Sequence, residues 1–303
     1  MTTFNVNGIK LSCDSFGDSR AEPLILIAGL GTQMIRWPVM FCESLVAKGY
    51  RVIRFDNRDA GCSSHFKHFP TPDFNALAAA LSTGQRPNVA YSLFDMAADV
   101  IGLLDALEIP RAHLVGRSMG GMIAQIAASK YPERVLSLTS IMSSTGNPSL
   151  PSASPEVMAM LTQPAPNPFD DERGFLEHRL AFARRIASPG YPFDEQYHRA
   201  LILEETRRAY DPGSFGRQIA AIAVAGDLRT LLARITVPSL IVHGADDALV
   251  PVACGRDTAS SIQGSEFMLI DGMGHDLPAS LFQTVADGID RVARRSINGG
   301  TND

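Results

Sequence analysis

Residues 112–129 of the chain are AHLVGRSMGGMIAQIAAS, and this stretch decides the fold. Ala112–Val115 is an apolar run typical of a buried strand, and Met119–Lys130 has the composition of a helix, which Tyr131-Pro132 ends. Glycines two residues before and two residues after Ser118 allow this strand and helix to approach each other closely. Strand, G-x-S-x-G turn and helix together predict a nucleophile elbow, in which a strained backbone exposes the serine hydroxyl.

The pentapeptide alone is weak evidence, because a chain of this composition contains G-x-S-x-G by chance about one time in six. The alternative interpretation is a turn of small residues that only packs a helix on a sheet. The rest of the chain has to decide between a nucleophile elbow and such a structural turn.

The composition is that of a globular protein, with 303 residues, 45% of them hydrophobic and 19% charged. A net charge of −5 gives no basic surface for nucleic acid or for anionic membranes. We expect no secretion signal, no membrane span, no metal site and no cofactor. The cysteines are scattered, as in a reducing compartment, so we expect a cytoplasmic protein; they are Cys13, Cys42, Cys62 and Cys254.

The order of segments predicts a largely parallel sheet that starts with a hairpin. Residues 2–16 alternate around Asn7-Gly8, a type I′ turn signal between two antiparallel edge strands. Buried strands and helices then alternate, which favours βαβ units. The strands are predicted at 24–28, 51–55, 112–115 and 134–140, and the helices at about 37–48, 91–107 and 119–130, with an irregular stretch at 63–89.

A different composition begins after residue 146. Six prolines lie in residues 146–168, and no strand pattern returns before residue 239. This pattern predicts an all-helical insertion of about 75–80 residues between two strands of the sheet; its helices are expected near 171–187, 194–209 and 214–225. Strands at 239–243 and 266–270 and a last helix at about 279–295 follow, with a disordered tail at 298–303.

Residues with suggestive chemistry follow four of the predicted strands. Gly29-Leu30-Gly31 follows the first buried strand, Ser118 follows the central one, Asp246-Asp247 follows strand 239–243, and His275 follows strand 266–270. Because the carboxyl ends of parallel strands lie at one rim of a sheet, we expect these residues to meet there. Nucleophile, carboxylate and histidine in this order are typical of a hydrolase triad.

These residue types fit the parts of a serine hydrolase. Ser118 needs a base, which His275 supplies, and a carboxylate that orients the imidazole. The pattern G-x-x-D-x-x-V-P at 244–251 favours Asp247 as this acid, with Asp246 as the alternative; a surface histidine is the alternative for His275. The N–H groups of Met119 and Leu30 are expected to bind the oxyanion.

The chain resembles the α/β-hydrolase superfamily over nearly its whole length. The matching segments are AGLG at 28–31, RFDNRDAGCS at 54–63, VGRSMGGMIAQ at 115–125, YPERV at 131–135, HGADDALVP at 243–251 and GMGH at 272–275. Within it, the chain is most similar to the esterase-like branch that includes aclacinomycin methylesterase and many bacterial carboxylesterases.

The resemblance implies an α/β fold with an eight-stranded, mostly parallel sheet and helices on both faces. It also implies a helical cap at about 147–225 on a core formed by residues 1–146 and 226–303, and ester hydrolysis through an acyl-serine. A serine at position 118, where epoxide hydrolases and haloalkane dehalogenases have an aspartate, argues against those activities. Two positions depart from the family pattern, Ala28 before the glycine loop and Arg117 before the nucleophile.

The expected function is hydrolysis of a small or medium, largely apolar carboxylic ester. Cleavage of a lactone, an amide or a C–C bond, or cofactor-free perhydrolysis, would use the same triad. A ligand-binding receptor or inactive homologue on this fold is the alternative outside enzymes. The charge of Arg117 beside the elbow either favours anionic substrates or pairs with a carboxylate of the protein, and we expect the pairing. The sequence predicts a small-molecule partner and leaves the oligomeric state open.

Overall fold

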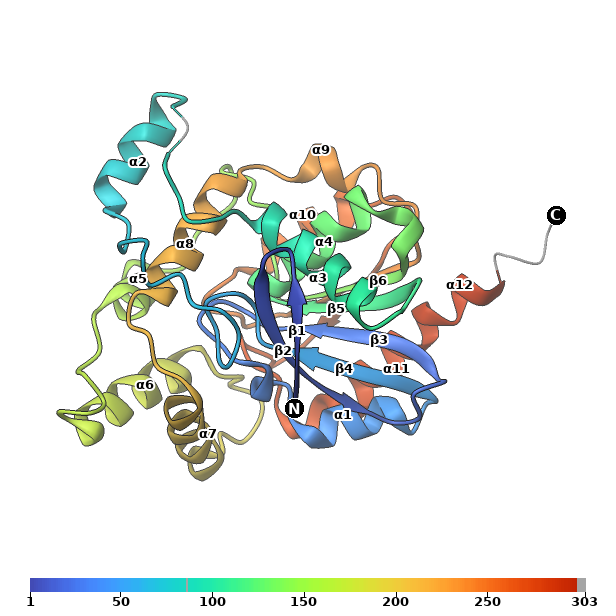
Figure 1. The fold of residues 1–303 in the computed structure, drawn as a ribbon, viewed down its shortest axis with the longest axis horizontal. Helices are drawn as coiled ribbons and strands as arrows, with labels where there is room; N and C mark the ends of the chain where they lie inside the picture. The colour runs from blue at the N-terminus through green and yellow to red at the C-terminus, as the bar shows by residue number, and fades with distance from the viewer. Residues whose placement is uncertain (86, 299–303) are drawn as a thin grey trace.

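The computed structural model describes residues 1–85 and 87–298, which form an eight-stranded sheet with helices on both faces (Figure 1). The strand order is β1-β2-β4-β3-β5-β6-β7-β8. The strands are β1 (Thr2–Val6), β2 (Ile9–Phe16), β3 (Glu22–Ile27), β4 (Tyr50–Phe55), β5 (Ala112–Arg117), β6 (Val135–Ile141), β7 (Ser239–Gly244) and β8 (Glu266–Ile270). The expected α/β fold and the eight-stranded sheet are confirmed.

The hairpin at the start of the chain forms as the sequence predicts. Asn7 and Gly8 have φ values of 50° and 80°, as a type I′ turn requires, and β1 pairs antiparallel with β2. β2 is also antiparallel to β4, while the remaining pairs are parallel. Only β1 of the two predicted edge strands lies at the edge, because β4 covers the other side of β2.

The strand order reverses at β3, which lies between β4 and β5. The chain therefore adds β4 on one side of β3 and later adds β5 on the other side of β3. At such a switch point the loops after the two neighbouring strands separate and leave a crevice at their carboxyl ends. The loop after β3 begins at Ala28, and the loop after β5 begins at Ser118, so topology brings the glycine loop to the elbow.

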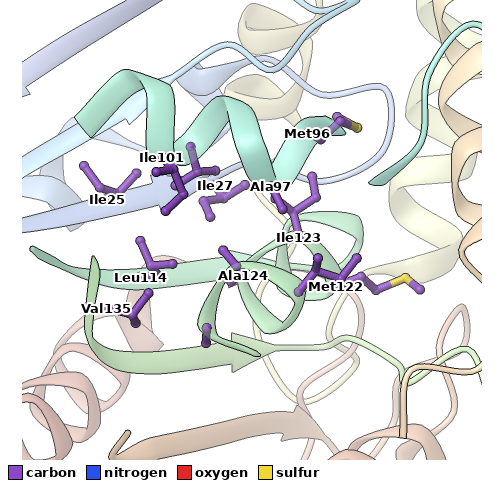
Figure 2. Packing of buried hydrophobic residues seen from close by; sticks show 14 of the residues in the cluster. Ile25, Ile27, Met96, Ala97, Ile101, Leu114, Met122, Ile123, Ala124 and Val135 are labelled. Carbon is purple, nitrogen blue, oxygen red and sulfur yellow. The ribbon is translucent and has the colours of Figure 1, made fainter. Parts of the chain in front are cut away.

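Each face of the sheet carries its own apolar layer. On one face, Ile25 and Ile27 of β3 pack with α3 (Leu93–Ala106) and α4 (Met119–Lys130), as Figure 2 shows. The alternate residues Leu24 and Leu26 pack on the other face with α1 (Val39–Val46) and α11 (Phe282–Ala293). All four of these side chains are fully buried, and each stabilises the fold by about 2 kcal/mol relative to exposure.

The insertion between β6 and β7 is helical, as predicted. It contains α5 (Pro155–Thr162), α6 (Glu172–Ile186), α7 (Glu195–Arg208), α8 (Ser214–Ala225) and the short α9 (Arg229–Leu232). In Figure 1, α5, α6 and α7 lie beside the sheet rather than over one of its faces. The exact division into a core and a cap at 147–225 stays a prediction.

Two helices form in stretches whose prolines favour irregular chain. The first is α5, where six nearby prolines suggested irregular chain; Pro155 instead occupies the first turn, and Ser154 caps the Val157 N–H at 3.3 Å. The second is α2 (Phe74–Ser82), which Asp73 caps. The apolar residues of α2 do lie at helical spacing, but only Leu77 is buried, and the three prolines in residues 63–89 favour an irregular stretch.

The remaining helical segments complete the core. They are η1 (Met34–Arg36), η2 (Pro132–Arg134), α10 (Val252–Ser261), η3 (Ala279–Leu281) and α12 (Arg295–Asn298). The predicted last helix is thus divided among η3, α11 and α12. Apart from Asn298, the predicted disordered tail lies outside the described residues. Within the described part of the chain, no helix has both the length and the apolar character needed to cross a membrane.

Three arginine–carboxylate pairs join the insertion to loops of the sheet. Arg36 after the glycine loop pairs with Glu205 of α7, and Arg208 of α7 reaches Asp56 at 2.7 Å. Arg217 of α8 donates to both oxygens of Asp59, at 2.8 and 2.9 Å. These pairs are largely shielded from water, so loss of one partner would leave an uncompensated charge. They therefore fix the insertion against the rim of the sheet.

The close approach of β5 and α4 leads to a stability prediction. A Cβ atom on Gly116 would lie 2.0 Å from the Gly120 carbonyl oxygen, which is backbone and cannot rotate away. Gly116→Ala should lower the free energy of unfolding by about 3 kcal/mol or more, because strand and helix must separate. Urea denaturation followed by circular dichroism measures this loss.

Gly264→Ala is the matched control. Gly264 has a φ of +74° and open space around its Cβ position, so alanine there costs only backbone strain, about 1 kcal/mol. Equal losses in the two variants would contradict the steric explanation.

Candidate active site

Ser118 stands between β5 and α4 in a backbone conformation that side chains rarely adopt. Its φ and ψ are 54° and −124°, at a cost of about 1–3 kcal/mol. Two backbone hydrogen bonds hold it there: the Ser118 N–H donates to the Ile141 carbonyl at 2.9 Å, and the Gly121 N–H donates to the Ser118 carbonyl at 2.8 Å. The turn therefore has the geometry of the predicted nucleophile elbow.

His275 lies within hydrogen-bond distance of the serine hydroxyl. Its Nε2 is 3.0 Å from Ser118 Oγ, and its Nδ1 is 2.7 Å from Asp247 Oδ2. Because a carboxylate accepts hydrogen bonds, Nδ1 carries the proton and Nε2 presents a lone pair to the serine. The insertion helps to place this loop, since the His275 N–H donates to the Ile186 carbonyl at the end of α6 at 2.7 Å.

Asp247 is buried and fixed at both of its oxygens. Oδ1 accepts from the N–H groups of Leu249 and Val250 at 2.9 and 2.8 Å, which leaves Oδ2 for His275. Asp246 is exposed and accepts instead from the Gly272 N–H at 2.9 Å. The structure thus brings Ser118, His275 and Asp247 together and leaves Asp246 outside.

His243 is close to the same acid but has another hydrogen-bond partner. Its Nε2 donates to the Val250 carbonyl at 2.8 Å and lies 3.7 Å from Asp247 Oδ2. Burial lowers the pKa of His243 below its ordinary value, which favours a neutral imidazole. This side chain therefore supports the loop that carries Asp247.

The glycine loop lies directly against Ser118. A Cβ on Gly29 would be 3.3 Å from Ser118 Cβ. Within residues 1–85 and 87–298, the Leu30 and Met119 N–H groups donate to no protein acceptor. Met119 opens α4, whose first turn has free donors and the positive end of the helix dipole. Their assignment as oxyanion donors stays a proposal.

Gln218 of α8 supports the glycine loop and was not recognised in the sequence. Its Oε1 accepts from the Gly31 N–H at 2.8 Å, and its Nε2 donates to the Arg58 carbonyl at 3.0 Å. A single glutamine on a helix that begins nearly 200 residues after the loop gives no local signal. Only the folding of the insertion onto the rim brings it there.

The turn after β4 also holds the glycine loop in place. The Asp56 carboxylate accepts from the Met34 N–H at 2.7 Å, and Asn57 Nδ2 donates to the Ala28 carbonyl at 3.0 Å. The sequence of residues 57–61 favours a tight turn held by arginine–carboxylate hydrogen bonds. Both partners come from distant helices, since Arg58 binds Asp99 of α3 and Asp59 binds Arg217 of α8.

Asp59, His65 and Asp211 are close enough to share a metal ion. Arg217, however, donates to both carboxylates, at 2.8 and 2.9 Å to Asp59 and at 2.6 Å to Asp211. A guanidinium in this place compensates the negative charge that would attract a cation. We therefore assign this cluster to the junction of α8 with the sheet rather than to metal binding.

The expectation that Arg117 pairs with a carboxylate is wrong. Among the residues that the structure describes, its guanidinium makes one hydrogen bond, from Nη1 to the Arg36 carbonyl at 3.2 Å. The guanidinium carbon also lies 5.8 Å from the centroid of the Trp37 ring. The nearest elements supply an aromatic face and a carbonyl instead of an anion, and neither is visible from the sequence around residue 117.

Comparison with known proteins agrees with this arrangement. A family model described as alpha/beta hydrolase fold matches residues 22–279. Rhodomycin D methylesterase of Streptomyces peucetius is 31% identical, over 93% of this chain and 94% of that protein. The 3-oxoadipate enol-lactonase 2 of Acinetobacter baylyi is 27% identical, over 89% and 88% of the two chains.

Among solved structures, the enol-lactonase from Burkholderia xenovorans superposes with a TM-score of 0.69. It is 24% identical, and the match covers 98% of this chain and 100% of that one. Together with the family model, these matches confirm the resemblance that the motifs indicated. This chain belongs to the α/β-hydrolase family.

Proposed function

We propose that this protein is a serine hydrolase that cleaves a carboxylic ester through an acyl-Ser118 intermediate. The observation that carries the proposal is the chain of hydrogen bonds from Ser118 Oγ through His275 to Asp247, at 3.0 and 2.7 Å. This chain supplies a nucleophile, a base with a free lone pair and a buried acid that orients the base.

In the first half of the reaction, His275 Nε2 takes the proton of Ser118 as Oγ bonds to the ester carbonyl carbon. The Leu30 and Met119 N–H groups bind the oxyanion, and Asp247 stabilises the imidazolium. Collapse of this intermediate breaks the bond to the leaving alcohol, which takes the proton from His275.

In the second half, a water molecule gives its proton to His275 Nε2 and bonds to the acyl carbon. The bond to Ser118 Oγ then breaks, the serine regains its proton from His275, and the carboxylic acid leaves. Both halves use the same groups, so no cofactor takes part in the proposed reaction.

The 31% identical methylesterase, which spans nearly the whole chain, supports an ester, while a 29% identical putative carbamate hydrolase and a 27% identical 2-hydroxy-6-oxononadienedioate hydrolase support the alternative bonds named above. We further propose that α5–α8 form a cap and that the substrate binds between it and the rim. The four cysteines are free thiols, which fits the proposed cytoplasmic location.

Ser118→Ala tests the proposal most directly. Wild type should hydrolyse p-nitrophenyl esters with a preference for short acyl chains, and the variant should lose about 10⁵- to 10⁶-fold in kcat. Release of p-nitrophenol at 405 nm follows the reaction. Wild-type activity no greater than that of Ser118→Ala would favour the receptor-like alternative.

Substitution of each of the two neighbouring aspartates tests which of them orients His275. Asp247→Asn should reduce kcat by about 10⁴-fold, because an amide no longer holds the imidazole in the required tautomer. Asp246→Asn changes one exposed hydrogen bond and should cost less than about 10-fold. The opposite ranking in the same p-nitrophenyl butyrate assay would exchange the roles of the two residues.

A further inference from the structure

Arg117 is a cation beside the nucleophile that the proposed reaction does not use. It directly precedes Ser118, is half-buried and is held by the Arg36 carbonyl and the Trp37 ring. Its Nε and Nη2 donors have no protein acceptor within the described ranges, 1–85 and 87–298. A guanidinium carries five N–H donors in a planar fork that matches a carboxylate.

The two carboxylates near Arg117 are already bound to other groups. Glu205 forms two bonds with Arg36, from Nε at 2.9 Å and from Nη2 at 2.6 Å. Asp276 accepts from both the N–H and the hydroxyl of Ser188. Arg117 is therefore left without a matching anion although the surroundings contain two.

The electrostatic surroundings agree with an uncompensated cation. Burial first, and the charge of Arg36 second, lower the pKa of the Arg117 guanidinium against the opposing effect of Asp276 and Glu205. Burial also lowers the pKa of Arg179, which lies half-buried on α6 near Glu205 and Arg36. The protein thus places positive charge here that an anion would stabilise.

We propose that Arg117 binds a carboxylate of the substrate, so that the preferred ester carries a negative charge close to the bond that is cleaved. This inference rests on the proposed ester hydrolysis and adds its substrate class. Arg117 directly precedes Ser118, and Asp276, whose charge acts on Arg117, directly follows His275, so the guanidinium and the proposed triad lie at the same rim of the sheet. Partial burial strengthens such a charged hydrogen bond relative to one in water.

Matched pairs of p-nitrophenyl and phenyl esters test this substrate class. Mono-p-nitrophenyl glutarate carries the carboxylate in its acyl group, and its terminal amide is the neutral counterpart of the same shape. For the leaving-group side, 4-carboxyphenyl butyrate is compared with 4-carbamoylphenyl butyrate. Wild type should prefer the anionic member of at least one pair by about 10- to 100-fold in kcat/KM.

The variants separate a binding role from a structural one. Arg117→Met should reduce the preference within that pair to about 3-fold or less, mainly by raising KM for the anionic ester, while Arg117→Lys should retain part of it. Arg207→Met removes an exposed arginine of α7, whose side chain is 69% exposed, and should leave the preference unchanged. High salt should weaken the preference of wild type.

If Arg117→Met does not fold, inhibition of wild-type p-nitrophenyl butyrate hydrolysis by glutarate, compared with glutaramide at low and high salt, gives the same information. Hydrolysis of neutral esters with no anionic preference in either pair would overturn this inference and leave the proposed function intact. Absence of Ser118-dependent hydrolysis of every ester would instead overturn the proposed function.

Discussion

The contact between the backbones of β5 and α4 is the constraint on which the site depends. A Cβ on Gly116 would meet the Gly120 carbonyl, and a Cβ on Gly120 would meet the Ile27 carbonyl at 2.2 Å. Strand, helix and the neighbouring β3 therefore touch through backbone atoms. This approach forces Ser118 into its positive φ and turns its hydroxyl out of the sheet toward His275.

The residues of the proposed triad meet because four loops leave the same rim. Ser118, Asp247 and His275 follow β5, β7 and β8, and the glycine loop follows β3 at the switch point of the sheet. Parallel strands supply this common rim without any contact between the loops in sequence. Short hydrogen bonds from backbone N–H groups then fix the acid, so the imidazole is oriented before any substrate arrives.

Charged contacts decide how the insertion lies on this rim. Burial acts to raise the pKa of Glu205, but the charge and hydrogen bonds of Arg36 outweigh it and hold the pKa below its ordinary value. The same insertion contributes Gln218 to the glycine loop and the Ile186 carbonyl to the His275 loop. The helices of the insertion therefore also position groups of the proposed catalytic machinery.

The sequence by itself determined the features that depend on local pattern: the hairpin at Asn7-Gly8, the buried strands, the elbow at Ser118 and the order of nucleophile, acid and histidine. It favoured Asp247 over Asp246, but only the fold shows which carboxylate reaches His275. Helices α2 and α5 escaped prediction because both lie among prolines, which favour irregular chain but are also accepted just before a helix or in its first turn. Tertiary structure alone decided the partners of Arg58, Asp59 and Arg117, because those contacts join elements far apart in the chain. The charge of a side chain does not specify which distant group the fold will place beside that side chain.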